Sequence, residues 1–147
     1  MVKIKVKKLM ESAQLPRYAH VGAFGDLAAD VYASEEKVLA AAGEAGSTAA
    51  VPTGIAMEFP STHGALVEDR SGLAVRGVTT LAGVIDPGYR GELKVVMTNL
   101  GPAPVEIKAG ERIAQLRIVE RIEAAFEEVE ELGEAARGVG GFGSTGR

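Results

Sequence analysis

The sequence contains no cysteine and no tryptophan, and aromatic residues make up only 5% of its 147 positions. The absence of cysteine excludes disulfides, thiolate nucleophiles and cysteine-ligated zinc or iron–sulfur sites. Histidine occurs only as His20 and His63, which disfavours a histidine-rich metal site. A core must therefore consist of Val, Ile, Leu and Ala, and the hydrophobic content of 46% is sufficient for one domain of this length.

Basic residues are not in excess either, since the formal net charge is −4. A protein that grips a nucleic-acid backbone usually has a basic patch. The one dense basic run, within Met1–Leu9, alternates with apolar residues as the solvated face of a strand does. No apolar run reaches the ~18 residues of a membrane span, and the N-terminus lacks a signal-peptide pattern. We therefore expect a cytoplasmic protein that contacts neither nucleic acid nor membrane.

Short apolar or alternating segments, separated by turn residues, are what the sequence has in abundance. They predict strands at Met1–Leu9, Asp30–Ser34, Ala49–Phe59, His63–Glu68, Leu81–Ile85, Glu92–Leu100, Val105–Lys108 and Arg112–Ile122. Glu35–Thr48 is broken by Gly43 and Gly46, which indicates a further strand with a hairpin loop. Short strands at close spacing are typical of a barrel or sandwich, so the expected fold class is all-β.

Two segments favour helix instead. Ser71–Arg76 has the length of one or two helical turns, and Ser71 can cap it. Ile122–Arg137 is dominated by Glu, Ala and Leu, and the intrinsic propensity of these residues predicts a helix.

The first feature with chemical potential is Arg70-Ser71-Gly72, where the short helix begins. Backbone N–H groups at a helix N-terminus, a hydroxyl and a guanidinium together suit a phosphate group. The alternative is an ordinary helix start with a surface arginine, and the triplet alone favours that plainer reading.

A second feature is the turn Asp86–Gly91 between two apolar strands, carrying Asp86, Tyr89 and Arg90. Such a turn can hold a general base, a packing ring and an ion pair. A hairpin with a free backbone edge can also read a planar base through its own N–H and C=O groups. An ordinary hairpin with a solvated aspartate explains the same residues equally well.

The third feature is Gly138–Arg147, which has five glycines in ten residues and a single aromatic, Phe142. Glycine amides approach anions closely, and Arg137, Ser144 and Thr145 add charge and hydroxyls. The ending typical of a nucleoside-triphosphate P-loop is absent. A simple linker is the alternative.

Together with two further segments, these features resemble the five short motifs of the dUTPase family, in order along the chain. The matching segments are Asp30–Ala33, Arg70–Ala74, Gly83–Glu92, Gly110–Leu116 and Arg137–Gly146. For the first motif, Asp26-Leu27 is a rival match to Asp30-Val31.

The resemblance implies a distorted, jelly-roll-like β-barrel with one short helix, assembled as a homotrimer whose active sites are shared between chains. It divides the chain into a barrel domain with a C-terminal arm, residues 1–136, and a tail, residues 137–147, that closes the active site. It also implies that Ile122–Arg137 is mainly strand and coil, extending to a neighbouring subunit, rather than helix.

The activity implied by the resemblance is hydrolysis of dUTP to dUMP and pyrophosphate, which lowers dUTP and supplies dUMP for thymidylate synthesis. Asp86 would be the catalytic general base for water attack on the α-phosphorus. Tyr89 would pack beneath the deoxyribose and exclude a ribose, while the backbone at Gly83 and Val84 would read uracil.

The same resemblance assigns the triphosphate to the other motifs. Ser71, Gly72 and Gln115 would hold the α- and β-phosphates, and Arg70 would add positive charge. Mg²⁺ would be held by the phosphates and waters, with Asp30 acting at most indirectly. In the tail, Phe142 would stack on uracil, Arg137, Ser144 and Thr145 would bind the terminal phosphate, and Gly143 would also contact the substrate.

Three positions depart from the family's pattern. Asp69 stands where a proline commonly precedes the second motif, Glu111 replaces an aspartate, and Thr80 replaces an asparagine near the uracil pocket of many bacterial members. Asp69 places a negative charge beside the predicted phosphate site.

Two other functions remain open at this point. A dCTP deaminase shares the fold and an Ile-Asp-Pro-Gly hairpin, and Glu92 would then act near the base. A non-catalytic nucleotide-sensing protein on the same fold is the second alternative, although Asp86, Gln115 and the tail argue for catalysis.

Overall fold

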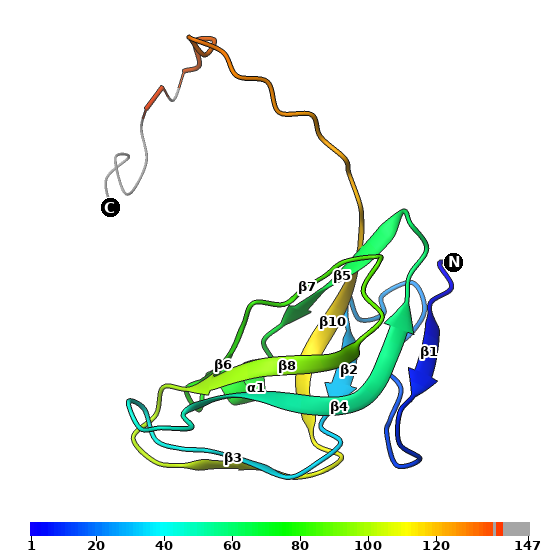
Figure 1. Cartoon of the computed structure of the whole chain (residues 1–147), viewed down its shortest axis with the longest axis vertical. Coiled ribbons are helices and arrows are strands. Elements are labelled where there is room, and N and C mark those ends of the chain that lie inside the picture. Colours follow the sequence, from blue (N-terminus) through cyan, green and yellow to red (C-terminus); the bar gives the residue numbers. More distant parts are fainter. Residues whose placement is uncertain (137, 140–147) are drawn as a thin grey trace.

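The computed structural model describes residues 1–136, 138 and 139. Within them lie ten strands and one short helix, labelled in Figure 1. Their bounds are β1 (Lys5–Lys8), β2 (Ala29–Tyr32), β3 (Lys37–Leu39), β4 (Thr48–Glu58), β5 (His63–Glu68), α1 (Ser71–Ala74), β6 (Val78–Leu81), β7 (Val84–Ile85), β8 (Glu92–Asn99), β9 (Val105–Ile107) and β10 (Arg112–Glu120). The expectation of an all-β chain with one short helix is therefore confirmed.

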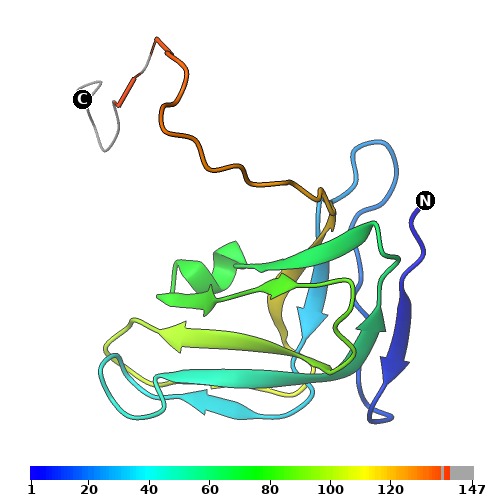
Figure 2. The same ribbon diagram turned by 45° about the horizontal axis from the view of Figure 1, so that its top comes forward.

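The strands form antiparallel sheets that share one core. One sheet has the order β1-β4-β8-β6, a second has the order β2-β10-β5-β7, and β3 pairs with β9. Figure 2 shows the two larger sheets as layers facing each other. The core between them contains buried side chains from both, such as Ile55 and Leu93 from one and Val31 and Leu116 from the other. No residue of this core is aromatic except Phe59, as the composition predicts.

The long strand β4 serves two partners because it bends at Gly54. Its first part pairs with β8 from Thr48 to Pro52 and again at Ala56, after an irregularity in the register, and its last part, from Ile55, pairs with β1. Gly54 has a φ of 68°, and a Cβ there would lie 2.8 Å from Met10 Cγ. Only glycine combines this backbone conformation with such a close contact.

The predicted strand Leu81–Ile85 is wrong, because the chain changes sheets within it. β6 ends at Leu81 and pairs with β8, whereas β7 begins at Val84 and pairs with β5. Ala82 and Gly83 between them have φ values of 60° and 110°. Both values lie in the left-handed region, which no regular strand tolerates. Hydrophobicity alone does not reveal this break, since Ala82 is as apolar as its neighbours.

Residues 121–136 form no helix or strand, so the helix predicted from propensity is wrong and the coil implied by the resemblance is confirmed for this part. Figure 1 shows this segment, which we call the arm, leaving the end of β10 and running away from the sheets. Its large apolar side chains, Ile122, Phe126, Val129 and Leu132, are exposed. Propensity fails here because an isolated helix of this length is marginal without a packed face.

In the part of the chain that the structure describes, no helix is long and apolar enough to cross a membrane. The one helix, α1, has four residues.

Candidate active site

The turn from β5 into α1 presents Arg70 and Ser71 at the surface. Arg70 has an extended backbone and is the residue preceding the helix, while Ser71 is already its first residue. The expected capping by Ser71 is therefore wrong, and the helix start has no side-chain cap. A Cβ placed on the following Gly72 would meet nothing within 4 Å. Because none of the residues that the structure describes occupies that space, another group can approach the backbone there.

Asp30 anchors this turn to β2 and β10. Its carboxylate accepts a hydrogen bond from Arg70 Nε at 3.0 Å and another from Arg112 at 3.3 Å. The Asp30 side chain is only 13% exposed. Asp26, the rival position for the first motif, pairs instead with His20, whose ring nitrogen lies 3.0 Å away. The geometry thus places Asp30, and not Asp26, in direct contact with the second motif.

Gln115 completes this group from β10, where it lies opposite Asp30 in the strand register. Its amide donates to the backbone carbonyl of Asp69 at 3.0 Å. A cavity of about 330 Å³ is lined by Asp30, Arg70, Ser71 and Gln115, together with Arg112 and the loop residues Ala19, His20, Asp26, Leu27 and Ala28. Two guanidinium groups, a hydroxyl and an amide face this space together with the carboxylates of Asp26 and Asp30, and both guanidinium groups donate to Asp30. The donors of this set can bind an anion with several oxygens.

The hairpin of the third motif forms a second group. Val84 is 72% exposed and lies in β7, the last strand of its sheet, so that one edge of its backbone has no strand beside it among the described residues. Gly83 lets this edge pass close to β5, because a Cβ there would lie 2.6 Å from the carbonyl oxygen of Val67. An unpaired backbone edge offers N–H and C=O groups to a planar ligand.

Asp86 and Tyr89 lie in the turn that follows β7. The Tyr89 hydroxyl donates to the carbonyl of Glu92 at 2.9 Å, which folds the ring back over the turn. A Cβ at Gly91 would lie 2.5 Å from that hydroxyl oxygen, so a side chain there would displace the ring. A cavity of about 170 Å³ is lined by Val84, Ile85, Asp86, Tyr89, Glu92 and Lys94.

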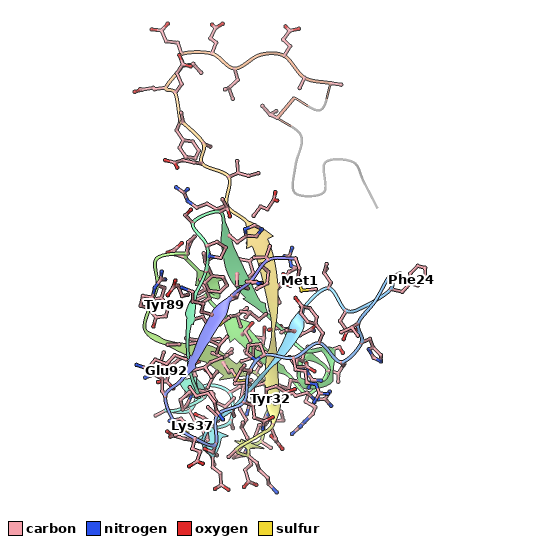
Figure 3. All side chains as sticks on the ribbon, turned by 90° about the vertical axis from the view of Figure 1, so that its right-hand side faces the viewer. Met1, Phe24, Tyr32, Lys37, Tyr89 and Glu92 are labelled. Atoms are coloured by element: carbon pink, nitrogen blue, oxygen red, sulfur yellow. The ribbon has the colours of Figure 1, made fainter. Side chains whose placement is uncertain are left out.

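The described part of the chain does not bring these two groups of residues into one cavity. The residues predicted to bind phosphate line one cavity, and those predicted to bind the nucleoside and to act as base line another. In Figure 3, Tyr89 lies on one side of the molecule, and Phe24, on the loop that borders the larger cavity, projects on the opposite side. The predicted residues Arg137, Phe142, Gly143, Ser144 and Thr145 lie outside the described part of the chain.

Arg112 and His20 line the larger cavity, and sequence reasoning did not single them out as site residues. Arg112 lies inside the fourth matching segment, so its position in the sequence could have identified it as a site residue. His20 reaches the cavity only because Asp26 accepts hydrogen bonds from its backbone and ring. That loop conformation has no signature in the sequence.

The three residues that depart from the family's pattern, Asp69, Thr80 and Glu111, each form hydrogen bonds within the fold. Glu111 accepts a hydrogen bond from the backbone N–H of Lys108 at 3.1 Å and closes the turn before β10. Thr80 donates to Asp69 through its backbone and its hydroxyl. These hydrogen bonds all lie within the chain itself.

Comparison with known proteins places the chain in one family. The family model for dUTPase matches residues 18–146. A deoxyuridine 5'-triphosphate nucleotidohydrolase of Thermobifida fusca is 48% identical, over 99% of this chain and 79% of the relative. One of Clostridium acetobutylicum is 42% identical, over 99% of this chain and 98% of the relative.

Solved structures agree with the sequence relatives. The dUTPase of Staphylococcus bacteriophage 80alpha with dUPNHPP superposes with a TM-score of 0.85 at 26% identity, covering 99% of each chain. A dUTPase of the S. aureus phage phi11 superposes with a TM-score of 0.76 at 24% identity, covering 88% of this chain and 97% of the other. This chain belongs to the dUTPase family.

Proposed function

We propose that this chain hydrolyses dUTP to dUMP and pyrophosphate. The observation that carries the proposal is that the family model spans residues 18–146 and therefore includes all five motif segments. The two relatives named above are deoxyuridine 5'-triphosphate nucleotidohydrolases by name, and each aligns with 99% of this chain. Hydrolysis of this kind needs a positioned water, a base and an environment that neutralises the triphosphate.

Asp86 is the general base in this proposal. Its carboxylate accepts a proton from a water as that water attacks the α-phosphorus, and the bond from the α-phosphorus to the bridging oxygen of pyrophosphate breaks. Asp86 lines the same cavity as Tyr89, which would place it beside the sugar. The Tyr89 ring, fixed by its bond to Glu92, would leave no room for a ribose 2′-hydroxyl.

Uracil is read by the free edge of β7 in this proposal. Uracil presents a donor flanked by two acceptors, which matches alternating C=O and N–H groups of a strand edge at Val84. Cytosine presents an amino donor where uracil has an acceptor, so a backbone donor would remain unpaired, at a cost of ~1–3 kcal/mol. The 5-methyl group of thymine would meet the hairpin.

The larger cavity holds the phosphates in this proposal. Ser71, the amides near Gly72, and Gln115 bind the α- and β-phosphates, and Arg70 contributes charge. Mg²⁺ bound to the triphosphate would neutralise developing negative charge. The oxygens of Asp30 already accept bonds from two arginines, which suits an ion held by phosphates and waters better than one held by Asp30 directly.

A homotrimer would unite the two groups of residues. If the cavity with Arg70 from one subunit faces the hairpin with Asp86 from another, a nucleoside triphosphate can contact both. The arm supports such an exchange, because an extended segment of this length spans up to ~50 Å. Phe126 in the arm is 99% exposed, which is unfavourable unless another chain covers it.

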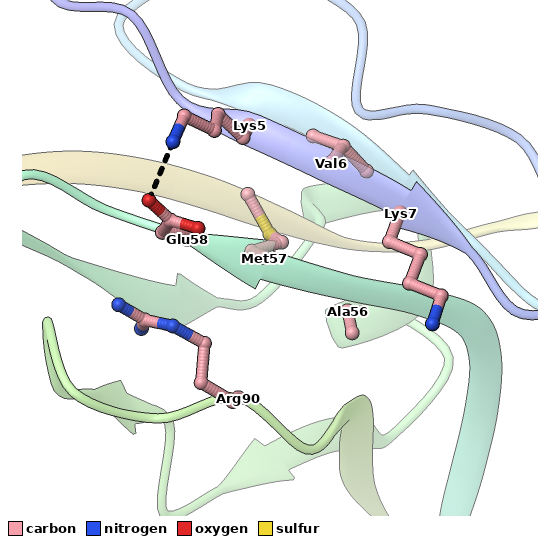
Figure 4. Close-up of a pocket in the computed structure, with 7 residues that line it drawn as sticks. All are labelled: Lys5, Val6, Lys7, Ala56, Met57, Glu58 and Arg90. Atoms are coloured by element: carbon pink, nitrogen blue, oxygen red, sulfur yellow. Dashed lines mark hydrogen bonds and ion pairs between the residues drawn. The ribbon is translucent and has the colours of Figure 1, made fainter.

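A groove on each subunit is suited to receive the arm of another. This groove, of about 410 Å³, runs between β1 and the hairpin turn and has an apolar floor that includes Val6 and Met57 (Figure 4). Lys5, Lys7 and Arg90 border it, and Lys5 pairs with Glu58 at 2.7 Å. The arm carries glutamates at positions 123, 127, 128, 130, 131 and 134 together with its apolar side chains. Their charge is complementary to the border of the groove.

Sedimentation equilibrium at low micromolar concentration is therefore expected to give a mass of three times 15.2 kDa. Replacing both Phe126 and Val129 by serine should shift the equilibrium toward smaller species, because it removes apolar area that another chain would cover. Replacing the exposed Val75, beyond α1, by serine is the control and should leave the mass unchanged. A fully active monomer would contradict the shared site.

Turnover of dUTP, dCTP, TTP and UTP with identification of products tests the function itself. We expect pyrophosphate and dUMP from dUTP, and at least tenfold lower kcat/KM for the other three. Release of ammonia from dCTP would favour the deaminase alternative. Tight binding of dUTP without any turnover would favour a nucleotide-sensing protein.

A further inference from the structure

Asp69 is the one residue of the β5–α1 connection whose side chain turns away from the phosphate cavity toward the neighbouring sheet. It directly precedes Arg70, yet its carboxylate accepts a hydrogen bond from Thr79 Oγ1 at 2.6 Å. It also accepts bonds from the backbone N–H and the hydroxyl of Thr80, at 2.6 and 2.7 Å. Since Thr79 and Thr80 belong to β6, the carboxylate joins the end of one sheet to the edge strand of the other.

The main chain of the same residue holds Gln115. The carbonyl of Asp69 accepts the hydrogen bond from Gln115 Nε2 at 3.0 Å. A displacement of the Asp69 backbone therefore moves the acceptor that orients Gln115, and it moves Arg70 and Ser71 through the chain itself. One residue thus connects β6, the amide of Gln115 and the turn that begins α1.

The charge of Asp69 is stabilised by these contacts. Burial raises the pKa of the carboxyl, but the hydrogen bonds from Thr79 and Thr80 outweigh burial and lower the pKa below its usual range. Asp69 is thus ionised near neutral pH, although an anion beside a phosphate site repels the ligand. The three hydrogen bonds that Asp69 accepts from β6 indicate a structural benefit that offsets this repulsion: they hold the β5–α1 connection against β6.

We infer that Asp69 is a positioning residue for dUTP hydrolysis, which fixes Gln115 and the Arg70-Ser71 turn against β6; this inference rests on the proposed function. The side chains at positions 69 and 80 act as a pair, with the carboxylate as acceptor and the threonine as double donor.

Removing the carboxylate is the first test. Asp69→Ala is expected to lower kcat for dUTP by about 10- to 100-fold with a smaller change in KM, because small misplacements of positioning groups cost rates of this size. Asp69→Asn should retain most of the turnover. Its amide oxygen can still accept the two bonds from Thr80, and its NH₂ group can donate to the Thr79 hydroxyl. Its lost charge should leave KM equal or lower.

A second variant removes two of the same hydrogen bonds without changing Asp69. Thr79→Val with Thr80→Val keeps the shape of both side chains but leaves the carboxylate only the backbone donor of Thr80. This double variant should lose kcat in the same direction as Asp69→Ala, and it covers the case in which Asp69→Ala does not fold. Thr48→Val is the matched control, since it removes the 2.7 Å bond to Thr98 between β4 and β8, outside both cavities.

A double-mutant cycle separates positioning from a purely structural role. If Asp69 acts through Gln115, adding Asp69→Ala to Gln115→Ala should cost much less than it costs alone. Wild-type kcat with a lowered Tm in Asp69→Ala would overturn the inference, and so would fully additive losses in this cycle and in a second cycle of Asp69→Ala with Ser71→Ala. Failure of the proposed function is distinguishable, because in that case the unmodified protein itself does not hydrolyse dUTP.

Discussion

Replacing Asp86 by asparagine is expected to reduce turnover of dUTP by about 10²–10⁴-fold, the usual range for loss of a general base. An amide keeps the size and hydrogen-bonding reach of the carboxylate but cannot accept the proton of the attacking water. The variant should still bind dUTP, because Asp86 is one of several groups that line its cavity. Single-turnover assays of dUMP formation, with binding measured by calorimetry, separate these two effects.

Glu106→Gln provides the matched control for Asp86→Asn. Glu106 is an exposed carboxylate of β9 that lines neither cavity, so its amide variant should turn over dUTP at the wild-type rate. Wild-type turnover in Asp86→Asn would remove Asp86 from the mechanism. Loss of both binding and turnover would assign it to substrate binding instead.

Deleting residues 138–147 is expected to abolish most turnover of dUTP while leaving the trimer and the binding of dUMP intact. The segment contains five glycines, Phe142, Ser144 and Thr145, and it follows Arg137. Stacking of a base on an aromatic ring contributes ~1–3 kcal/mol, and each charge-assisted bond to a phosphate contributes ~1.5–3 kcal/mol. Loss of several such contacts corresponds to a decrease of ~10²-fold or more in kcat/KM.

Two point variants refine the truncation. Phe142→Ala should cause part of the loss, whereas Phe142→Tyr, which keeps an aromatic face, should retain most of the wild-type kcat/KM. Equal kcat/KM for the truncated and full-length chains would mean that residues 138–147 are a linker. In that case the match to the fifth motif would be a coincidence of glycine-rich sequence.

The sequence predicted most strands because their patterning is local. Ala49–Phe59 and His63–Glu68 agree with β4 and β5 to within one residue, since each is a largely apolar segment and the turn residues that begin at Pro60 separate them. The break at Ala82 was missed because an alanine with a positive φ is fixed by pairing to two different sheets. The helix expected in the arm failed for the opposite reason, because local propensity there has no tertiary packing to support it.

The candidate site was predictable as a set of motifs but not as an arrangement. Asp86 and Ser71 were identified from short segments, yet nothing in those segments says that they line separate cavities. The contacts of Asp69 with Thr79 and Thr80 join residues ten and eleven positions apart across a sheet boundary. Sequence spacing could mark Asp69 as unusual, but only the fold supplies its partners.

The separation of the two cavities has a genetic consequence. If Asp86 and Gln115 serve any one site from different chains, a defective chain impairs sites that its normal neighbours help to form, so a mutant allele can be dominant. Conversely, two alleles that are each inactive, one altered at Asp86 and one at Gln115, can complement each other when they are expressed together. Some of the mixed assemblies then contain a site that takes its intact Asp86 from the chain altered at Gln115 and its intact Gln115 from the chain altered at Asp86.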